Sequence, residues 1–371
     1  MTKISFNQAI PFEATHVGEV IKDELKARNM KQSHLSEITS IQKPILNDVI
    51  KGKRALTPQM ALLMENALGI SATYLMNIQT QYDLDKAKQS ERVILQKKML
   101  DIWNIIKEQI SIPLFRKANI VRGNVIEDVK RIFQVFNVQN LDDFLGLKAQ
   151  EMEYAYYRKS DKAKTNPTDI FSWKYYCYHL SQNDDLTLPP FQKDADTNAL
   201  TSRLNTIFRE NDNTVNKTKQ TLNQYGIRLL IVNKTGQVPV DGMSFWNGEN
   251  PTIVITERIP SIDNFAFTTL HEVGHVFKHL VRGGQAMINL EEGKKSIEEN
   301  EADQFALNAI LPTDEWKKFL AKTRNVVPYK IAPHIKEEAD RHNINPQLLF
   351  GRYKHDTETY KIKNHFESKI R

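Results

Sequence analysis

Residues 265–280 read FAFTTLHEVGHVFKHL and contain a His-Glu-x-x-His motif that runs from His271 to His275. Apolar residues recur through this stretch at helical spacing, at Phe265, Phe267, Leu270, Val273, Phe277 and Leu280. The pattern predicts an amphipathic helix, with Asp263 and Asn264 as candidate N-caps. Because the two histidines are four residues apart, they share one face of this helix.

Two imidazoles on one helix face can bind a single zinc ion at Zn–N distances of about 2.0–2.1 Å. Glu272 projects about 100° away from them, where it can reach a water on the metal and act as general base. We therefore predict His271 and His275 as metal ligands and Glu272 as the catalytic residue. The simpler alternative is an amphipathic helix with two histidines on its polar edge.

A catalytic zinc site needs a third protein ligand and leaves one position for water. The metzincin class would place a histidine where this chain has Val281, so that class is excluded. His279 lies eight residues beyond His271, about 12 Å along a helix, and cannot join the same tetrahedral shell. The third ligand is therefore expected from a later helix.

The segment SIEENEADQFALNAILP, which begins at Ser296, predicts that helix. Ser296 can cap it, Glu299 completes a capping box, and Pro312 marks its end. Glu299 and Asp303 share a face, so we predict Glu299 as the third ligand and Asp303 as the partner that orients a ligand histidine. Glu301, on another face, is the alternative ligand. The simpler alternative is that these carboxylates bind no metal and form a solvated acidic first turn, which the helix dipole favours.

The sequence HEVGH followed by EENEADQFALNAILP resembles the ImmA/IrrE family of zinc metallopeptidases. Two further stretches resemble that family, GMSFWNGENPTIVITERIPSIDNFAFTTLHE at residues 242–272 and NPQLLFGRY at residues 345–353. The resemblance covers roughly residues 221–355. It implies a zincin-like α+β domain that binds Zn²⁺ and cleaves DNA-binding repressors at defined sites.

Residues 17–79 predict five short helices. The first spans about residues 18–28, the second 32–38 and the third 43–50, and the fourth opens at Thr57-Pro58 and closes before Gly69. The fifth opens at Ser71. The spacing of the second and third helices is that of a helix-turn-helix, with apolar or small residues where the unit must pack: Leu35, Ser36, Ile41, Leu46 and Val49.

In a helix-turn-helix, the N-terminal residues of the recognition helix enter the major groove. Their side chains suit base edges, since amides pair with adenine and lysine with guanine. Candidate phosphate contacts lie at the start of the second helix and after the third. The predicted base contacts are Gln42, Lys43 and Asn47, and the predicted phosphate contacts are Gln32, Lys51, Lys53 and Arg54.

Residues 18–84 resemble a HigA-type antitoxin of the Cro/repressor helix-turn-helix class, most clearly at GKRALTP, residues 52–58. The resemblance implies a homodimer on a palindromic operator and a partner toxin. Two departures bear on the base contacts: Ser40 replaces a common turn glycine, and Pro44 lies early in the recognition helix. The alternative is a small helical bundle with solvated basic loops.

The middle of the chain, residues 85–220, predicts a helical connecting region, with residues 85–109 as one long helix. Its many aromatic side chains favour helix packing over base stacking. They include Tyr154, Tyr156, Tyr157, Phe171, Trp173, Tyr175, Tyr176 and Tyr178.

Residues 227–232 and 252–256 predict strands, and the Asp241-Gly and Asn247-Gly pairs predict turns between them. These strands belong either to an ordinary core sheet or to one whose exposed edge, beside the metal, holds an extended peptide by strand addition. Both can hold at once.

Composition limits the remaining possibilities. The single cysteine, Cys177, excludes a disulfide framework and a cysteine-based zinc site, which favours a cytoplasmic protein. The chain shows no signal peptide and no apolar run of about 18 residues, so we expect no membrane partner. A net charge of +6 permits nucleic-acid binding without demonstrating it.

We therefore predict a mainly α fold with a small β-sheet: a five-helix DNA-binding domain at 1–84, a helical connecting region at 85–220 and a metallopeptidase domain at 221–371. The leading hypothesis is a regulator that couples operator DNA binding to zinc-dependent cleavage of a repressor, a toxin or itself. A second is an antitoxin-repressor whose peptidase-like domain is a sensor or a toxin-binding surface. A third is a peptidase whose helix-turn-helix only docks a protein substrate.

Overall fold

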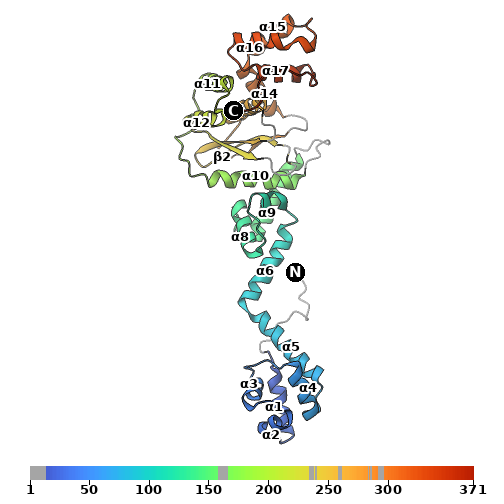
Figure 1. Cartoon of the computed structure of the whole chain (residues 1–371). Coiled ribbons are helices and arrows are strands. Elements are labelled where there is room, and N and C mark those ends of the chain that lie inside the picture. The colour runs from blue at the N-terminus through green and yellow to red at the C-terminus, as the bar shows by residue number, and fades with distance from the viewer. Residues whose placement is uncertain are drawn as a thin grey trace. The chain divides into compact units, whose positions relative to one another are not determined.

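The computed structural model shows a mainly helical protein with one four-stranded sheet, which confirms the predicted fold class (Figure 1). The chain divides into two compact units, Met1–Asn104 and Ile105–Arg371. Within the described part, no helix is long and apolar enough to cross a membrane. The described residues are 14–157, 166–233, 238, 240–257, 261–282, 284, 286–290 and 296–371, without the side chains of 153–157, 257, 289 and 290.

The first unit contains the five predicted helices, drawn in blue in Figure 1. They are α1 (Val17–Ala27), α2 (Gln32–Thr39), α3 (Lys43–Ile50), α4 (Pro58–Leu68) and α5 (Ala72–Gln89). Their apolar faces meet in one core that includes Val17, Ile21, Leu35, Leu46, Met64, Leu68 and Leu75, each 0% exposed. The unit therefore has a hydrophobic core of its own.

The prediction of one long helix over residues 85–109 is wrong. The structure has two helices there, α5, which ends at Gln89, and α6 (Glu91–Ile106). Ser90 interrupts them with an extended backbone at φ −68° and ψ 120°. Its carbonyl accepts a hydrogen bond from the Ile94 amide, as an N-cap residue does. Serine followed by an acidic first-turn residue is a capping signal that the helical periodicity concealed.

Four helices follow in the second unit and pack through aromatic side chains. They are α7 (Ile112–Lys117), α8 (Val125–Phe136), α9 (Leu141–Tyr157) and α10 (Pro167–Gln182). The Phe136 ring stacks on those of Phe171 and Tyr175, with centroids 4.9 and 5.1 Å away. The preference for packing over base stacking is thus supported at these residues, whereas the side chains of Tyr154, Tyr156 and Tyr157 lie outside the described residues.

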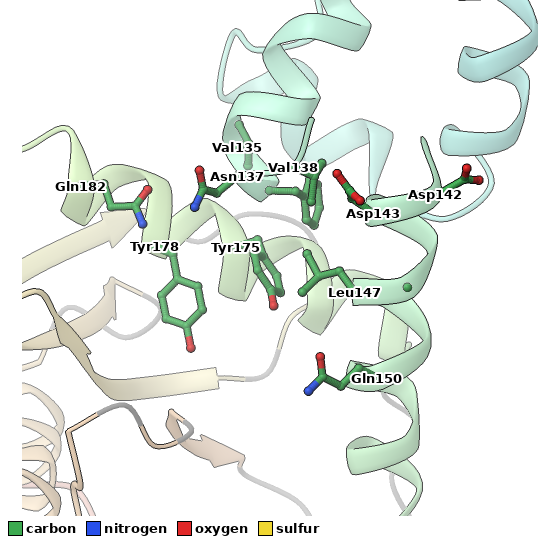
Figure 2. Close-up of a pocket in the computed structure, with 12 residues that line it drawn as sticks. Val135, Asn137, Val138, Asp142, Asp143, Leu147, Gln150, Tyr175, Tyr178 and Gln182 are labelled. Atoms are coloured by element: carbon green, nitrogen blue, oxygen red, sulfur yellow. The ribbon is translucent and has the colours of Figure 1, made fainter. Parts of the chain in front are cut away.

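A hollow of about 680 Å³ lies between α8, α9 and α10 (Figure 2). Tyr175 and Tyr178 of α10 line one side, and Leu147 and Gln150 of α9 line another. None of the residues predicted to carry chemistry lines it.

The sheet has strand order β1-β3-β2-β4, in which only the β1–β3 pair is parallel. Its strands are β1 (Arg228–Asn233), β2 (Val240–Asn247), β3 (Asn250–Glu257) and β4 (Met287–Leu290). Helices α11 (Thr197–Glu210) and α12 (Thr214–Gln224) precede it, and α13 (Ile262–Lys278) follows β3. The chain ends with α14 (Ile297–Ile310), α15 (Thr313–Lys322), the 3-10 turn Pro328–Lys330, α16 (Ala332–Arg341) and α17 (Pro346–Asp356).

Helices cover the two faces of this sheet. Successive residues of a strand point to opposite faces, and Phe245 contacts Tyr178 of α10 at a ring-centroid distance of 4.4 Å. On the same face, the hydroxyls of Thr252 and Ser181 lie 3.0 Å apart. Residues of the other face, among them Ile253, share the core of α13. Helix α13 is thereby enclosed, which places its histidines in the interior.

Two local predictions need correction. The Asp241-Gly pair is not a turn, because both residues lie inside β2, where an irregular register against β4 marks a bulge. The Asn247-Gly pair does turn, with Gly248 at φ +60°. The N-cap of α13 is Ser261 rather than Asp263 or Asn264.

We expect Phe136→Ala to lower the free energy of unfolding by about 3–5 kcal/mol, because the ring is 1% exposed and its loss leaves a cavity among four other rings. Chemical denaturation followed by fluorescence measures the change. Phe133→Ala, a half-buried position on the same helix, is the matched control. Equal losses in both variants would contradict a central role for Phe136.

Candidate metal centre and nucleic-acid interface

Helix α13 brings its two motif histidines together inside the domain. His271 and His275 are both 0% exposed, and their Nε2 atoms lie 3.0 Å apart. Two nitrogens that bind one tetrahedral zinc ion are separated by about 3.3 Å. The imidazole edges therefore converge on one point without any change in the helix.

Helix α14 supplies a carboxylate at the same point. One oxygen of Glu299 lies 3.2 Å from His271 Nε2, and the other lies 3.3 Å from His275 Nε2. These three side chains form a cluster that could hold a metal ion, with candidate ligand atoms within 4.8 Å of one another. Glu299 stands in the first turn of α14, where Ser296 accepts a hydrogen bond from its amide. The predicted Ser296 cap is thus confirmed, whereas the Glu299 carboxylate faces the histidines instead of completing a capping box.

The outer nitrogen of His271 faces a second carboxylate. Its Nδ1 lies 2.9 Å from Asp303 Oδ1, four residues along α14 from Glu299. Burial lowers the pKa of His271, but hydrogen bonds to Asp303 and Glu299 outweigh it and raise the pKa to about 9. Burial likewise opposes ionisation of Glu299, yet both histidines hold its pKa down at about 2. The Glu299 carboxylate is thus held in its ionised form beside the two motif histidines.

Glu272 differs from the neighbouring carboxylates because its side chain is fully shut off from solvent. The side chain is 0% exposed, and neither carboxylate oxygen has a hydrogen-bond partner within the described residues. Burial raises its pKa to about 8, although the neighbouring His271 and the Ser244 hydroxyl favour the charged form. A buried polar group without a partner costs free energy and calls for an explanation. A water held between this carboxylate and a zinc ion on the cluster would provide the missing partner, so the residues fit a zinc centre.

Strand β2 is shaped around this carboxylate. A Cβ atom placed on Gly242 would lie 2.3 Å from Glu272 Oε1, closer than real Cβ contacts come. A side chain at position 242 would therefore displace Glu272. The Asp241-Gly pair, which predicts a turn by composition, is instead a close approach of backbone to a buried side chain.

His279 and Glu301 make contacts beside the cluster that the sequence did not predict. His279 Nδ1 lies 3.1 Å from His275 Nδ1, and His279 Nε2 lies 2.8 Å from Glu301 Oε2. Glu301 thus faces His279, while Glu299 faces the two motif histidines. The sequence did contain one indication of the contact between His275 and His279, because their spacing of four residues puts both on one helix face.

The N-terminal unit has helix-turn-helix geometry at α2 and α3. Ser40 adopts the left-handed conformation, φ 54°, that the common turn glycine would adopt without strain. Ser36 donates a hydrogen bond from Oγ to the Ile41 carbonyl at 2.5 Å, which ties the turn to α2. Pro44 lies in the first turn of α3, where no intrahelical partner is lost. Neither departure from the common pattern disturbs the motif.

The predicted DNA contacts lie on the surface of this unit. Gln32 and Asn47 are half-buried, and the remaining candidates, Gln42, Lys43, Lys51, Lys53 and Arg54, are exposed. The four basic side chains fall at the start of α3 and in the residues just after it. Exposed cations at a recognition helix suit phosphate binding.

Comparison with known proteins finds two families in this chain. Residues 21–75 match the helix-turn-helix family, and residues 222–339 match the IrrE N-terminal-like domain. One curated relative is virulence-associated protein I of Dichelobacter nodosus, 29% identical over 82 residues, which are 22% of this chain and 76% of that protein.

Solved structures give likenesses to the N-terminal unit. The antitoxin HigA of Pseudomonas aeruginosa, solved with the higBA promoter, is 27% identical, covers 21% of this chain and 85% of its own, and has a TM-score of 0.20. An addiction module antidote protein of the HigA family from Coxiella burnetii is 23% identical, covers 23% of this chain and 95% of its own, and has a TM-score of 0.22.

We expect Glu272→Gln to make the metal-free protein more stable than the wild type above about pH 8. The folded state raises the pKa of Glu272 from its ordinary value to about 8, so folded protein keeps a proton that unfolded protein has lost. Stability is then lost as pH rises through this interval, and glutamine abolishes the loss. Thermal unfolding with chelator at about pH 5 and about pH 8.5 measures it.

The exposed residue Glu249 provides the control for this pH effect. Glu249→Gln should leave the pH dependence of the wild type unchanged. An identical pH dependence in Glu272→Gln and wild type would show that this carboxyl does not carry the effect.

Proposed function

We propose that this chain, which joins a helix-turn-helix domain to an IrrE-like domain, is a cytoplasmic transcriptional regulator. It would couple sequence-specific DNA binding to zinc-dependent, site-specific proteolysis of a regulatory protein. The observation that carries the proposal is the cluster of His271, His275 and Glu299 with the buried Glu272 carboxylate beside it, whose oxygens have no hydrogen-bond partner within the described residues.

The three cluster residues would hold Zn²⁺, which polarises a scissile carbonyl and lowers the pKa of a water. Asp303 accepts the Nδ1 proton of His271 and so keeps the Nε2 lone pair of that histidine free for the metal. Glu272 takes a proton from the attacking water and passes it to the departing amine. Gly242 leaves the space in which the Glu272 carboxylate stands.

The sheet offers a place for an extended protein segment. Within the described residues the sheet is bounded by β1 and β4, and β4 lies next to β2, the strand that contacts Glu272. Strand addition at the β4 edge would bring a substrate backbone alongside the centre. The substrate would be a repressor, a toxin or another copy of this chain.

The DNA-binding half of the proposal rests on the helix-turn-helix match and on the exposed basic side chains around α3. We propose a homodimer, because two-fold symmetric operators are read by two copies. Helix α6 has apolar side chains that suit contact with a second copy, at Val93, Ile94, Leu95, Leu100 and Ile105, each at least 40% exposed.

Proteolysis is tested with purified protein and Zn²⁺. We expect wild-type protein to cleave its regulatory substrate or itself, and Glu272→Gln to retain zinc but lose cleavage by at least about a hundredfold, because the proton acceptor is gone. Mass spectrometry of fragments measures cleavage, and Glu249→Gln serves as the active control. Fragments formed equally by Glu272→Gln would rule out this mechanism.

DNA recognition is tested by binding to an operator selected from random sequence. Asn47→Ala should cost about 1–3 kcal/mol and relax base preference at one position. Lys53→Ala should weaken all sequences alike and lower the salt slope by about 1, since it removes one phosphate contact. Titrations at several salt concentrations measure both effects and give the number of chains per operator. DNA binding that does not depend on salt concentration would favour the hypothesis that the helix-turn-helix only docks a protein substrate.

A second candidate function is an antitoxin-repressor whose IrrE-like domain senses a ligand or binds a toxin with little hydrolysis. It is favoured by the resemblance of residues 18–84 to HigA-type antitoxins. His271→Ala would then leave operator binding and toxin neutralisation intact. Stoichiometric zinc in carefully prepared wild-type protein favours the peptidase, and its absence favours this second function.

A further inference from the structure

The second motif histidine is held by a chain of two further side chains. His275 Nδ1 faces His279 Nδ1 at 3.1 Å, and His279 Nε2 faces Glu301 Oε2 at 2.8 Å. We propose that His279, itself oriented by Glu301, is a positioning residue that fixes the ring and the tautomer of His275 for metal binding. This inference rests on the zinc centre of the proposed function.

Proton positions allow one arrangement that serves the metal. His275 must keep a lone pair on Nε2, so its proton is on Nδ1 and is donated to His279 Nδ1. The proton of His279 is then on Nε2, where it is donated to the Glu301 carboxylate, which can only accept. Each ring nitrogen of His275 and His279 thus binds the metal, donates a hydrogen bond or accepts one, and each of their N–H protons has an acceptor.

The two ligand histidines are therefore supported differently. His271 donates directly to the Asp303 carboxylate, whereas His275 reaches the Glu301 carboxylate through a second imidazole. The side chain of His279 is 8% exposed, and that of Glu301 is 54% exposed. Because solvent screens Glu301, we expect His279 to contribute more to the centre than Glu301 does.

The end of helix α13 makes this contact possible. His279 is the C-cap residue, and its amide donates to the His275 carbonyl at 2.9 Å. The spacing of four residues places the two rings on one face of the helix in a T-shaped arrangement, with centroids 5.2 Å apart. His279 presents Nδ1 to the outer nitrogen of His275, so it supports that ligand and does not join the three residues of the cluster.

The experiment measures zinc affinity of the full chain by competition with a chromophoric chelator, and metal geometry from the visible spectrum of Co²⁺-substituted protein. We expect His279→Leu to bind zinc about 10–100-fold more weakly, with an altered Co²⁺ spectrum. His279→Asn should restore most of the affinity, because its Oδ1 can replace Nδ1 as the acceptor. Glu301→Gln, which keeps an acceptor oxygen, should lose less than Glu301→Ala.

His355→Leu is the matched control, since that histidine is 75% exposed and far along the sequence on α17. If His279→Leu does not fold, the comparison of His279→Asn with His279→Ala decides. The inference would be overturned if folded His279→Leu, or both His279→Asn and His279→Ala, kept wild-type zinc affinity and an unchanged Co²⁺ spectrum. That result would leave the proposed function standing. A wild-type protein that binds no zinc would overturn both.

Discussion

The close approach of strand β2 to helix α13 is the contact on which the rest of the candidate metal centre depends. Gly242 leaves room for the Glu272 carboxylate and for nothing larger, and that carboxylate is 0% exposed. Burying a carboxylate without a partner is costly, and the cost is accepted where a bound group completes the site. The sheet, which α10 covers on its other face, holds β2 in this position.

Helix α14 lies on the opposite side of the centre and contributes three acidic residues, each of which contacts a different group. Glu299 faces both motif histidines, Asp303 faces the outer nitrogen of the first, and Glu301 faces His279. They stand two residues apart along the helix, so successive carboxylates point in different directions. One capped helix thereby contacts both motif histidines and His279, and in the proposed function it would both bind the metal and support its two histidine ligands.

The DNA-reading unit is built by a separate set of contacts. Its five helices close around their own core, so the geometry of the recognition helix is set within residues 17–89. Two local conformations shape the motif, the left-handed Ser40 and the first-turn Pro44. In the proposed function, the metal centre acts on a regulatory protein while this unit selects the gene.

The sequence by itself determined the five N-terminal helices and the helices that carry the His-Glu-x-x-His motif and Glu299, because periodicity, caps and prolines act within a few residues. It predicted the helix-turn-helix, the capped helix at Ser296 and the pairing of Glu299 with Asp303 on one face. It did not place Asp241-Gly in a strand or join His279 to Glu301. Those outcomes depend on residues 22 to 31 positions away in the chain, Glu301 from His279 and Glu272 from Asp241. Only tertiary packing decided them, because a local turn preference contributes less free energy than packing a strand against a neighbouring buried helix.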